Sequence, residues 1–185
     1  MNPTKPTPLG PHNPDAEKSV LGGVLMNNEK FPKALALLDV EDFFSVRHRT
    51  IFTALEQLHR SESCLDVLTL KNELIETGAL ERAGGVSYIA GLCEGVPLSS
   101  NVEHYAKIVL SYTFKRDVLR QAQAIAHAIT SGITSDELAR LVTHLAELVV
   151  GRPKAAPDSD TQSNANRAAE TRGALLGWVN RQRPA

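Results

Sequence analysis

The sequence predicts an all-α protein with a globular helical head, a long antiparallel helical hairpin and a disordered tail. Apolar residues recur at helical spacing up to residue 150, whereas no stretch alternates strictly between apolar and polar residues as a half-buried strand would. The composition then shifts to Pro, Ala, Ser, Asn and Asp, which is typical of a disordered linker. We therefore expect a flexible arm over residues 1–11 and a helical domain over 12–150, divided into a head (12–98) and a hairpin (99–150). The remaining residues, 151–185, form the expected tail.

Helix boundaries in the head are marked by capping and breaking residues. Asn13 is a candidate N-cap and Pro14 suits the first helical position that follows it. Residues 46–60 predict a second amphipathic helix, and Asp66 is a candidate cap for the next one. Gly78 is a stop signal for that third helix.

The sequence "SVLGGVL" places Gly22 and Gly23 inside the first predicted helix, where each glycine costs about 1 kcal/mol relative to alanine. A phosphate-binding loop would need a following Lys-Ser/Thr and a preceding strand, and the sequence has neither. We therefore predict that Gly22 lies near another backbone. The second pair, Gly84-Gly85, is expected to form a turn into a short helix.

Residues 101–130 predict the longest helix, with Ser100 or Asn101 as its cap. Gly132 ends this helix, and Ser135 is expected to cap the second helix of the hairpin. A heptad-like apolar stripe, with Arg116 at its one polar position, runs through Tyr105, Val109, Tyr112, Leu119, Ala122, Ala126 and Ile129. Two helices cannot enclose their own apolar faces, so we expect much of this surface to meet the head or another chain.

Two sets of hairpin residues are therefore candidates for interaction. The apolar set, proposed for self-association, comprises Tyr105, Val109, Tyr112, Leu119, Ala122, Leu138, Leu141 and Leu145. The second set, proposed for contact with a partner chain, comprises Arg116, Arg120, Glu137, Arg140 and the tail residue Trp178. Trp178 is the only tryptophan; it is either an anchor for a partner or an incidental part of the chain end.

Composition and residue spacing argue against global binding of duplex DNA, a disulfide framework, a metal site and a membrane span. The 185 residues carry a net charge of -1, which argues against global basicity for wrapping duplex DNA but leaves a local basic patch open. Cys64 and Cys93 lack metal or disulfide spacing, and no apolar run is long enough for a membrane span, so a cytoplasmic protein is expected. The six histidines are scattered, and His48 is expected to anchor its helix by hydrogen bonds. We predict no catalytic residue, metal site or cofactor.

Four segments, in order and spacing, resemble the N-terminal domain of DnaB-type replicative DNA helicases: "PHNPDAEKSVLGGVL", "DFFSVRHRTIFTALEQL", "DVLTLKNELIETGALERAGGVSYIAGL" and "PLSSNVEHYAKIV". The resemblance covers about residues 11–150. Matching positions include Pro14, Glu17, Val20, Leu21, Gly22, Asp42, Phe43, His48, Arg49, Ile51, Phe52, Leu80, Gly84, Gly85, Tyr88, Leu92, Tyr105 and Val109.

The resemblance implies a non-catalytic domain that pairs through its hairpins, assembles into a collar of six and binds primase. The family's motor domain, with its P-loop, has no counterpart in this sequence, so ATP hydrolysis and unwinding are not carried over. The leading hypothesis is a replisome module that forms a homodimer, or a hexamer built as a trimer of dimers. Its expected partners are primase, the full-length replicative helicase or both. The alternatives are a nucleic-acid-binding helical protein that acts through its basic tail, and an enzyme whose site is not recognisable.

Overall fold

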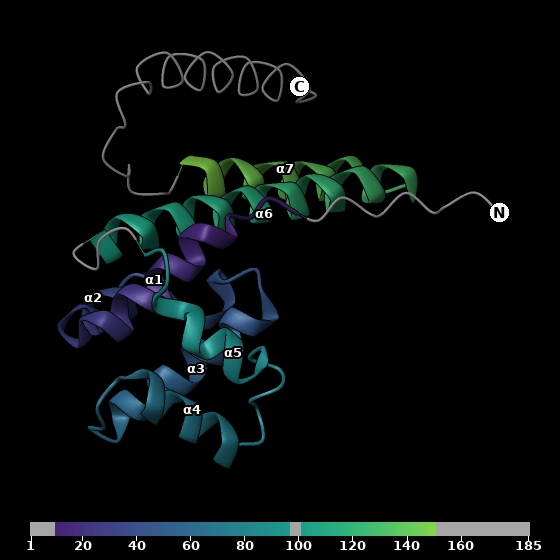
Figure 1. Cartoon of the computed structure of the whole chain (residues 1–185). Helices are drawn as coiled ribbons and strands as arrows, with labels where there is room; N and C mark the ends of the chain where they lie inside the picture. The colour runs from purple at the N-terminus through teal and green to yellow at the C-terminus, as the bar shows by residue number, and fades with distance from the viewer. Residues whose placement is uncertain (1–9, 97–100, 151–185) are drawn as a thin grey trace. The chain divides into compact units, whose positions relative to one another are not determined.

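The computed structural model describes residues 10–96 and 101–150, and within these ranges it contains helices and no strands (Figure 1). The α-helices are α1 (Pro14–Met26), α2 (Phe31–Leu35), α3 (Val46–Arg60), α4 (Val67–Glu76), α5 (Gly85–Ala90), α6 (Val102–Thr130) and α7 (Ser135–Val150). Three 3₁₀ turns are interspersed: η1 (Asn28–Lys30), η2 (Val40–Asp42) and η3 (Gly91–Cys93). The prediction of an all-α fold is confirmed. The expectations for the N-terminal arm, for Ser100 as a cap, and for the tail with Trp178 concern residues outside the described ranges.

The chain divides after Asp117 into two compact units. The first unit contains α1 to α5 together with the start of α6, and the second contains the rest of α6 and α7. The predicted bounds of head (12–98) and hairpin (99–150) stay predictions. The first unit extends into α6, where Val102, Ala106 and Val109 are buried with the head core.

The core of the first unit forms where helices far apart in sequence pack together. Helix α1 packs against η3 and α3, and α3 in turn packs against α4. Three fully buried aromatic residues adjoin one another: the Phe52 ring centroid lies 4.8 Å from that of Phe43 and 5.7 Å from that of Phe31. Aromatic side chains bury large apolar areas, so this cluster is a major source of the free energy of folding.

Capping residues begin the helices largely as predicted. The Asn13 side chain accepts a hydrogen bond from the Ala16 amide at 3.0 Å, and Asp66 caps α4 by accepting from two backbone amides. The α7 cap differs from the prediction, because Thr134 rather than Ser135 precedes the helix. The Glu137 carboxylate accepts from the Thr134 amide at 3.2 Å, and the Thr134 hydroxyl oxygen accepts from the Glu137 amide at 3.4 Å. This reciprocal pair is a capping box.

Gly22 lies inside α1 and against the backbone of η3. A Cβ atom added at Gly22 would collide with the carbonyl oxygen of Leu92 and would lie 2.6 Å from Cγ2 of Val96. The prediction of close backbone packing at Gly22 is confirmed. The turn predicted at Gly84-Gly85 is also present; φ is +103° at Gly84 and +74° at Gly85, where α5 begins.

Candidate functional site

A buried chain of hydrogen bonds joins α1, α3 and α5. The Glu17 and His48 residues are 2% and 3% exposed, and the His48 Nδ1 lies 2.6 Å from Oε2 of Glu17. The other ring nitrogen of His48, Nε2, lies 2.6 Å from the Tyr88 hydroxyl. An acid, a histidine and a hydroxyl group in series are typical of some nucleophilic enzymes. Here the hydroxyl belongs to Tyr88, and the Arg47 guanidinium covers the Tyr88 ring at 4.2 Å from its centroid. We therefore interpret these hydrogen bonds as structural.

The Glu17 carboxylate also caps α3. Ser45, the N-cap of α3, makes no capping hydrogen bond with its side chain; instead the backbone amides of Phe44 and Ser45 donate to Glu17 at 2.8 and 3.3 Å. Burial by itself would raise the pKa of Glu17, but the hydrogen bonds from His48, Phe44 and Ser45 and the charge of His48 outweigh burial and lower it. A negative charge at a helix N-terminus is further stabilised by the helix dipole. The prediction that His48 anchors its helix by hydrogen bonds is thus confirmed.

Arg116 fixes α6 to two segments of the head. Its guanidinium donates to the carbonyl oxygens of Asp42 at 2.5 Å and Pro11 at 3.3 Å, and to the Thr113 hydroxyl at 2.8 Å. Burial lowers the pKa of Arg116, although the nearby carboxylates of Glu17, Asp117 and Asp42 oppose this. Arg116 is thus engaged in hydrogen bonds within the first unit, and its contact with a partner chain stays a prediction.

The beginning of the predicted association stripe belongs to the head. Val109 is 1% exposed and packs in the core, and Tyr105 is half-buried against the same core. Tyr112 is half-buried, with the Lys115 ammonium 4.3 Å from its ring centroid. Because α6 packs on the head core along this part of the stripe, Val109 is not accessible to another chain. Tyr105 is accessible only in part.

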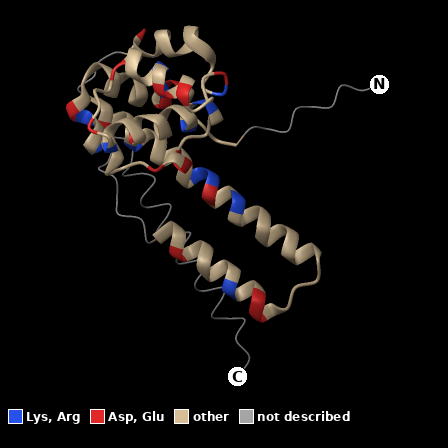
Figure 2. Ribbon diagram, turned by 90° about the horizontal axis from the view of Figure 1, so that it is seen from below, with Lys and Arg blue, Asp and Glu red and all other residues tan. Residues whose placement is uncertain are grey.

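In the second unit the stripe is exposed. None of residues 118–150 is buried, and the end of α6 runs antiparallel beside α7 (Figures 1 and 2). The continuation of the predicted stripe is exposed throughout and comprises Leu119, Ala122, Ala126 and Ile129, which we call the α6 stripe. No Lys, Arg, Asp or Glu occurs between Arg120 and Asp136, and the end of α6 is accordingly tan in Figure 2. The α6 stripe is thus an uncharged, solvent-exposed apolar surface.

A second, half-buried set of residues lies on the two hairpin helices. On α6 it comprises Val118, Gln121, Ile125 and Ala128, and on α7 it comprises Leu138, Leu141, Val142, Leu145 and Leu148. Both sets have the three- and four-residue spacing of one helix face. The α7 candidates Leu138, Leu141 and Leu145 are therefore only partly available to another chain.

The remaining partner candidates have mixed environments. Glu137 is exposed but engaged as part of the α7 capping box, and the hydrogen bonds from Thr134 lower its pKa. Arg120 and Arg140 are exposed side chains on α6 and α7, and their contact with a partner remains a prediction. Trp178 lies outside the described ranges.

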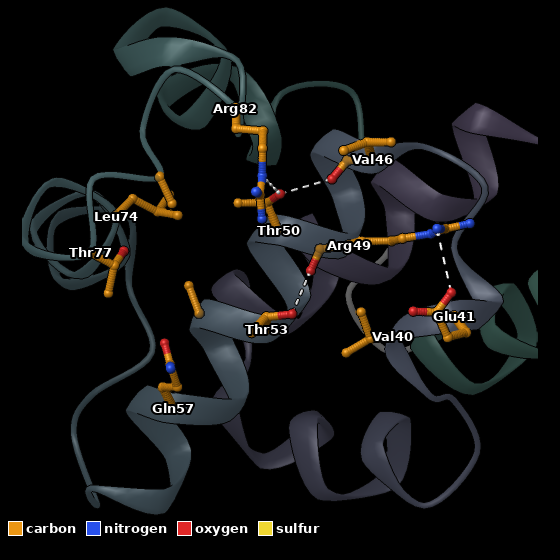
Figure 3. A pocket seen from close by; sticks show the side chains of 12 residues that line it. Val40, Glu41, Val46, Arg49, Thr50, Thr53, Gln57, Leu74, Thr77 and Arg82 are labelled. Atoms are coloured by element: carbon orange, nitrogen blue, oxygen red, sulfur yellow. Dashed lines mark hydrogen bonds and ion pairs between the residues drawn. The ribbon is translucent and has the colours of Figure 1, made fainter.

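The structure also brings together a groove that sequence reasoning missed. It has a volume of about 380 Å³ and is lined by η2, one face of α3, the end of α4 and the segment that leads to α5 (Figure 3). Its lining residues on α3 are Val46, Arg49, Thr50, Thr53, Ala54 and Gln57, which share one helix face. That spacing is the only sequence signal for the groove, since the opposite wall comes from later in the chain.

Residues 10–96 and 101–150 contain no group of three or more His, Cys, Asp or Glu side chains that could hold a metal ion. They also contain no helix long and apolar enough to cross a membrane.

A helical first unit, followed by the antiparallel end of α6 and α7, defines an all-α domain in the described residues. The sequence model of the DnaB-like helicase N terminal domain matches residues 10–111, and the chain belongs to this family. It is 37% identical over 117 residues to the replicative DNA helicase DnaB of Treponema pallidum (strain Nichols), which covers 63% of this chain and 27% of that protein. It is 35% identical over 118 residues to the replicative DNA helicase DnaC of Bacillus subtilis (strain 168), with 64% and 26% covered.

Solved structures agree with this assignment. The crystal structure of the N-terminal domain of DnaB helicase from Mycobacterium tuberculosis superposes with a TM-score of 0.67 at 26% identity, over 77% of this chain and 99% of that one. A structure described as a DnaB-like replicative helicase and its interactions with primase gives a TM-score of 0.60 at 22% identity, which supports the fold alone. It covers 85% of this chain and 35% of that one. This chain spans about a quarter of the length of its curated relatives, and the match is to their N-terminal domain and not to the ATPase motor.

Proposed function

We propose that the chain is a non-catalytic replisome module that self-associates through the α6 stripe and binds primase, the replicative helicase or both. Membership of the DnaB N-terminal domain family supports a role in DNA replication. The exposed α6 stripe is the observation that carries self-association. Primase binding is proposed by analogy, because a helicase of the same fold is described with its interactions with primase.

The α6 stripe has the form of a helix–helix interface. Leu119 and Ile129 are 42% and 55% exposed, and the alanines between them allow another helix to approach closely. Steps of three and four residues match the seam of helices that pack at a small crossing angle. Full burial of a leucine or isoleucine contributes about 1.5–3 kcal/mol, so covering these half-exposed side chains contributes about 1 kcal/mol each. In a two-fold symmetric dimer each contact occurs twice, which doubles the contribution.

A matched pair of substitutions tests this surface. Ala122 lies on the α6 stripe and Ala124 lies on the opposite side of the same helix, and both are exposed. Ala122→Asp should weaken self-association at least about tenfold, because a charge would be buried without a partner. Ala124→Asp introduces the same residue at the same cost in helix propensity and should associate like the wild type. Leu119→Asp should behave like Ala122→Asp.

Sedimentation velocity over a range of protein concentrations measures these effects. Circular dichroism should show equal helix content in all the variants. If Ala122→Asp and Ala124→Asp associate equally well, the proposed surface is wrong. Primase binding is tested separately by isothermal titration calorimetry with the purified helicase-binding domain of primase, and the absence of heat at high concentration would remove that part of the proposal.

A further inference from the structure

The groove on α3 combines an apolar floor with a few oriented polar groups. Ala54 and Leu74 form part of the floor, and Val40, Val46 and Ala79 extend the apolar lining. Its volume of about 380 Å³ lies within the range of ligand-binding pockets. The groove therefore has room for one or two side chains of a bound segment.

Each threonine hydroxyl in the groove already donates a hydrogen bond to a backbone carbonyl of its own helix. Thr50 Oγ1 donates to the Val46 carbonyl at 2.9 Å, Thr53 Oγ1 to the Arg49 carbonyl at 2.9 Å, and Thr77 Oγ1 to the Glu73 carbonyl at 2.8 Å. Because each hydroxyl points back to its own helix, these residues offer methyl groups and acceptor oxygens to the groove. The donors left to a ligand are the Gln57 amide and two guanidinium groups.

Both arginines are held through Nε. Arg82 Nε donates to Thr50 Oγ1 at 3.2 Å, and Arg49 Nε donates to the Phe43 carbonyl at 2.6 Å. In Figure 3 the Arg82 side chain descends onto Thr50, whereas Arg49 is directed towards Glu41. Fixing Nε orients the two terminal nitrogens of each guanidinium, and this planar fork matches a carboxylate. The orientation also reduces the side-chain entropy that binding would cost.

The charged side chains that line the groove favour an acidic ligand. Its lining contains two arginines and one carboxylate, Glu41, whose side chain is 82% exposed and 3.4 Å from Arg49 Nη1. An exposed ion pair of this length is weak, so a better-placed carboxylate can replace it. A nucleic-acid backbone fits less well, because the apolar floor offers no contact to phosphates and two arginines are few for a polyanion.

From these contacts we propose that the groove docks an acidic amphipathic segment of a partner protein. A carboxylate of that segment pairs with Arg82, and a neighbouring apolar side chain packs over Ala54 and Leu74. All the lining residues belong to the first unit, and the docking does not require self-association. Docking in the groove is thus separate from the proposed self-association, and either one can be absent while the other is present.

A synthetic peptide pair provides the probe. One peptide is a helix with leucines along one face and glutamates beside them, and the other has lysine in place of every glutamate. Titration of the isotope-labelled full chain, followed by NMR, should show amide shifts at Thr53, Gln57, Ala79 and Arg82 with the acidic peptide alone. Single-stranded DNA serves as a third ligand in the same experiment.

Two variants and a control assign the binding to the groove. Arg82→Glu should weaken binding of the acidic peptide about ten- to a hundredfold, the loss expected for one charge-assisted hydrogen-bonded pair. Thr53→Glu, an exposed change on α3, should weaken it in the same direction by repulsion. The control is Arg60→Glu, which reverses a charge on α3 outside the groove and should leave peptide affinity unchanged.

Each outcome decides the proposal. It is supported if both groove variants lose affinity, Arg60→Glu keeps it, and the sedimentation behaviour of all three stays that of the wild type. It is overturned if the lysine peptide or the DNA shifts the groove amides equally, or if the acidic peptide shifts none of them at millimolar concentration.

Discussion

The contact between Gly22 and the Leu92 carbonyl predicts that even a single methyl group at position 22 destabilises the protein. Gly22→Ala would place its Cβ in collision with the Leu92 oxygen and 2.6 Å from Cγ2 of Val96. The Val96 side chain can rotate, but the carbonyl belongs to the backbone of η3, so α1 and η3 must separate. Any separation disturbs the surrounding core, where Leu21 and Leu92 are fully buried.

Two opposing effects set the size of the change. Replacing glycine with alanine inside a helix stabilises it by about 1 kcal/mol. Forcing an extra methyl group into a packed interior costs about 1–3 kcal/mol. We expect a cost near the upper end of this range, because the colliding atom is the backbone carbonyl oxygen of Leu92. We therefore expect Gly22→Ala to lower the free energy of unfolding by about 1–2 kcal/mol. Gly22→Val, with its larger β-branched side chain, should lower it further.

Urea denaturation followed by circular dichroism measures the free energy of unfolding. The control is Gly91→Ala, because a Cβ at Gly91 would have the Glu94 carboxylate, 3.7 Å away, as its nearest neighbour. That variant should lie within about 0.5 kcal/mol of the wild type, as surface substitutions usually do. If Gly22→Ala is instead more stable than the wild type, helix propensity outweighs the contact and the argument from close packing is refuted.

Two further predictions concern the polar groups of the head. The lowered pKa of Glu17 means that its ionised carboxylate stabilises the fold; this contribution is complete above the ordinary value of 4.5 and is lost as the pH falls through the folded pKa. Urea denaturation at several pH values should give Glu17→Gln a lower stability at neutral pH and a shallower acid dependence than the wild type. Parallel curves would contradict this. Arg116→Ala removes donors to Asp42 and Pro11, and thermal denaturation should show a loss of about 1–3 kcal/mol. An unchanged melting temperature would show that these hydrogen bonds do not stabilise the fold, and would contradict the structural role of Arg116.

Local signals in the sequence were sufficient to predict the helices. Asn13 and Asp66 are caps whose partners lie within three residues, so their roles follow from short-range patterns alone. The tertiary contacts of the same helices were not predictable in this way. The sequence indicated that Gly22 meets a backbone, but Leu92 is remote in the chain and only the fold identifies it. His48 is similar, since its partners Glu17 and Tyr88 come from two other helices.

The apolar stripe of α6 shows a limit of periodicity. Heptad-like spacing identifies one face of a helix but does not identify what covers that face. Val109 and Leu119 lie on the same predicted stripe, yet Val109 is buried in the head and Leu119 is exposed in the second unit. Arg116, the polar interruption, lies beside the change and bonds to the head. The groove was missed for a related reason, because its walls are brought together only by the fold.

Self-association of the wild-type chain is the most direct test of the account. Sedimentation velocity should show the weight-average mass rising above that of one chain as the concentration approaches tens of micromolar. That result is expected because the α6 stripe is apolar surface that residues 10–96 and 101–150 of one copy leave exposed. A mass equal to that of one chain at every concentration would contradict self-association and, with it, the central claim of the proposed function.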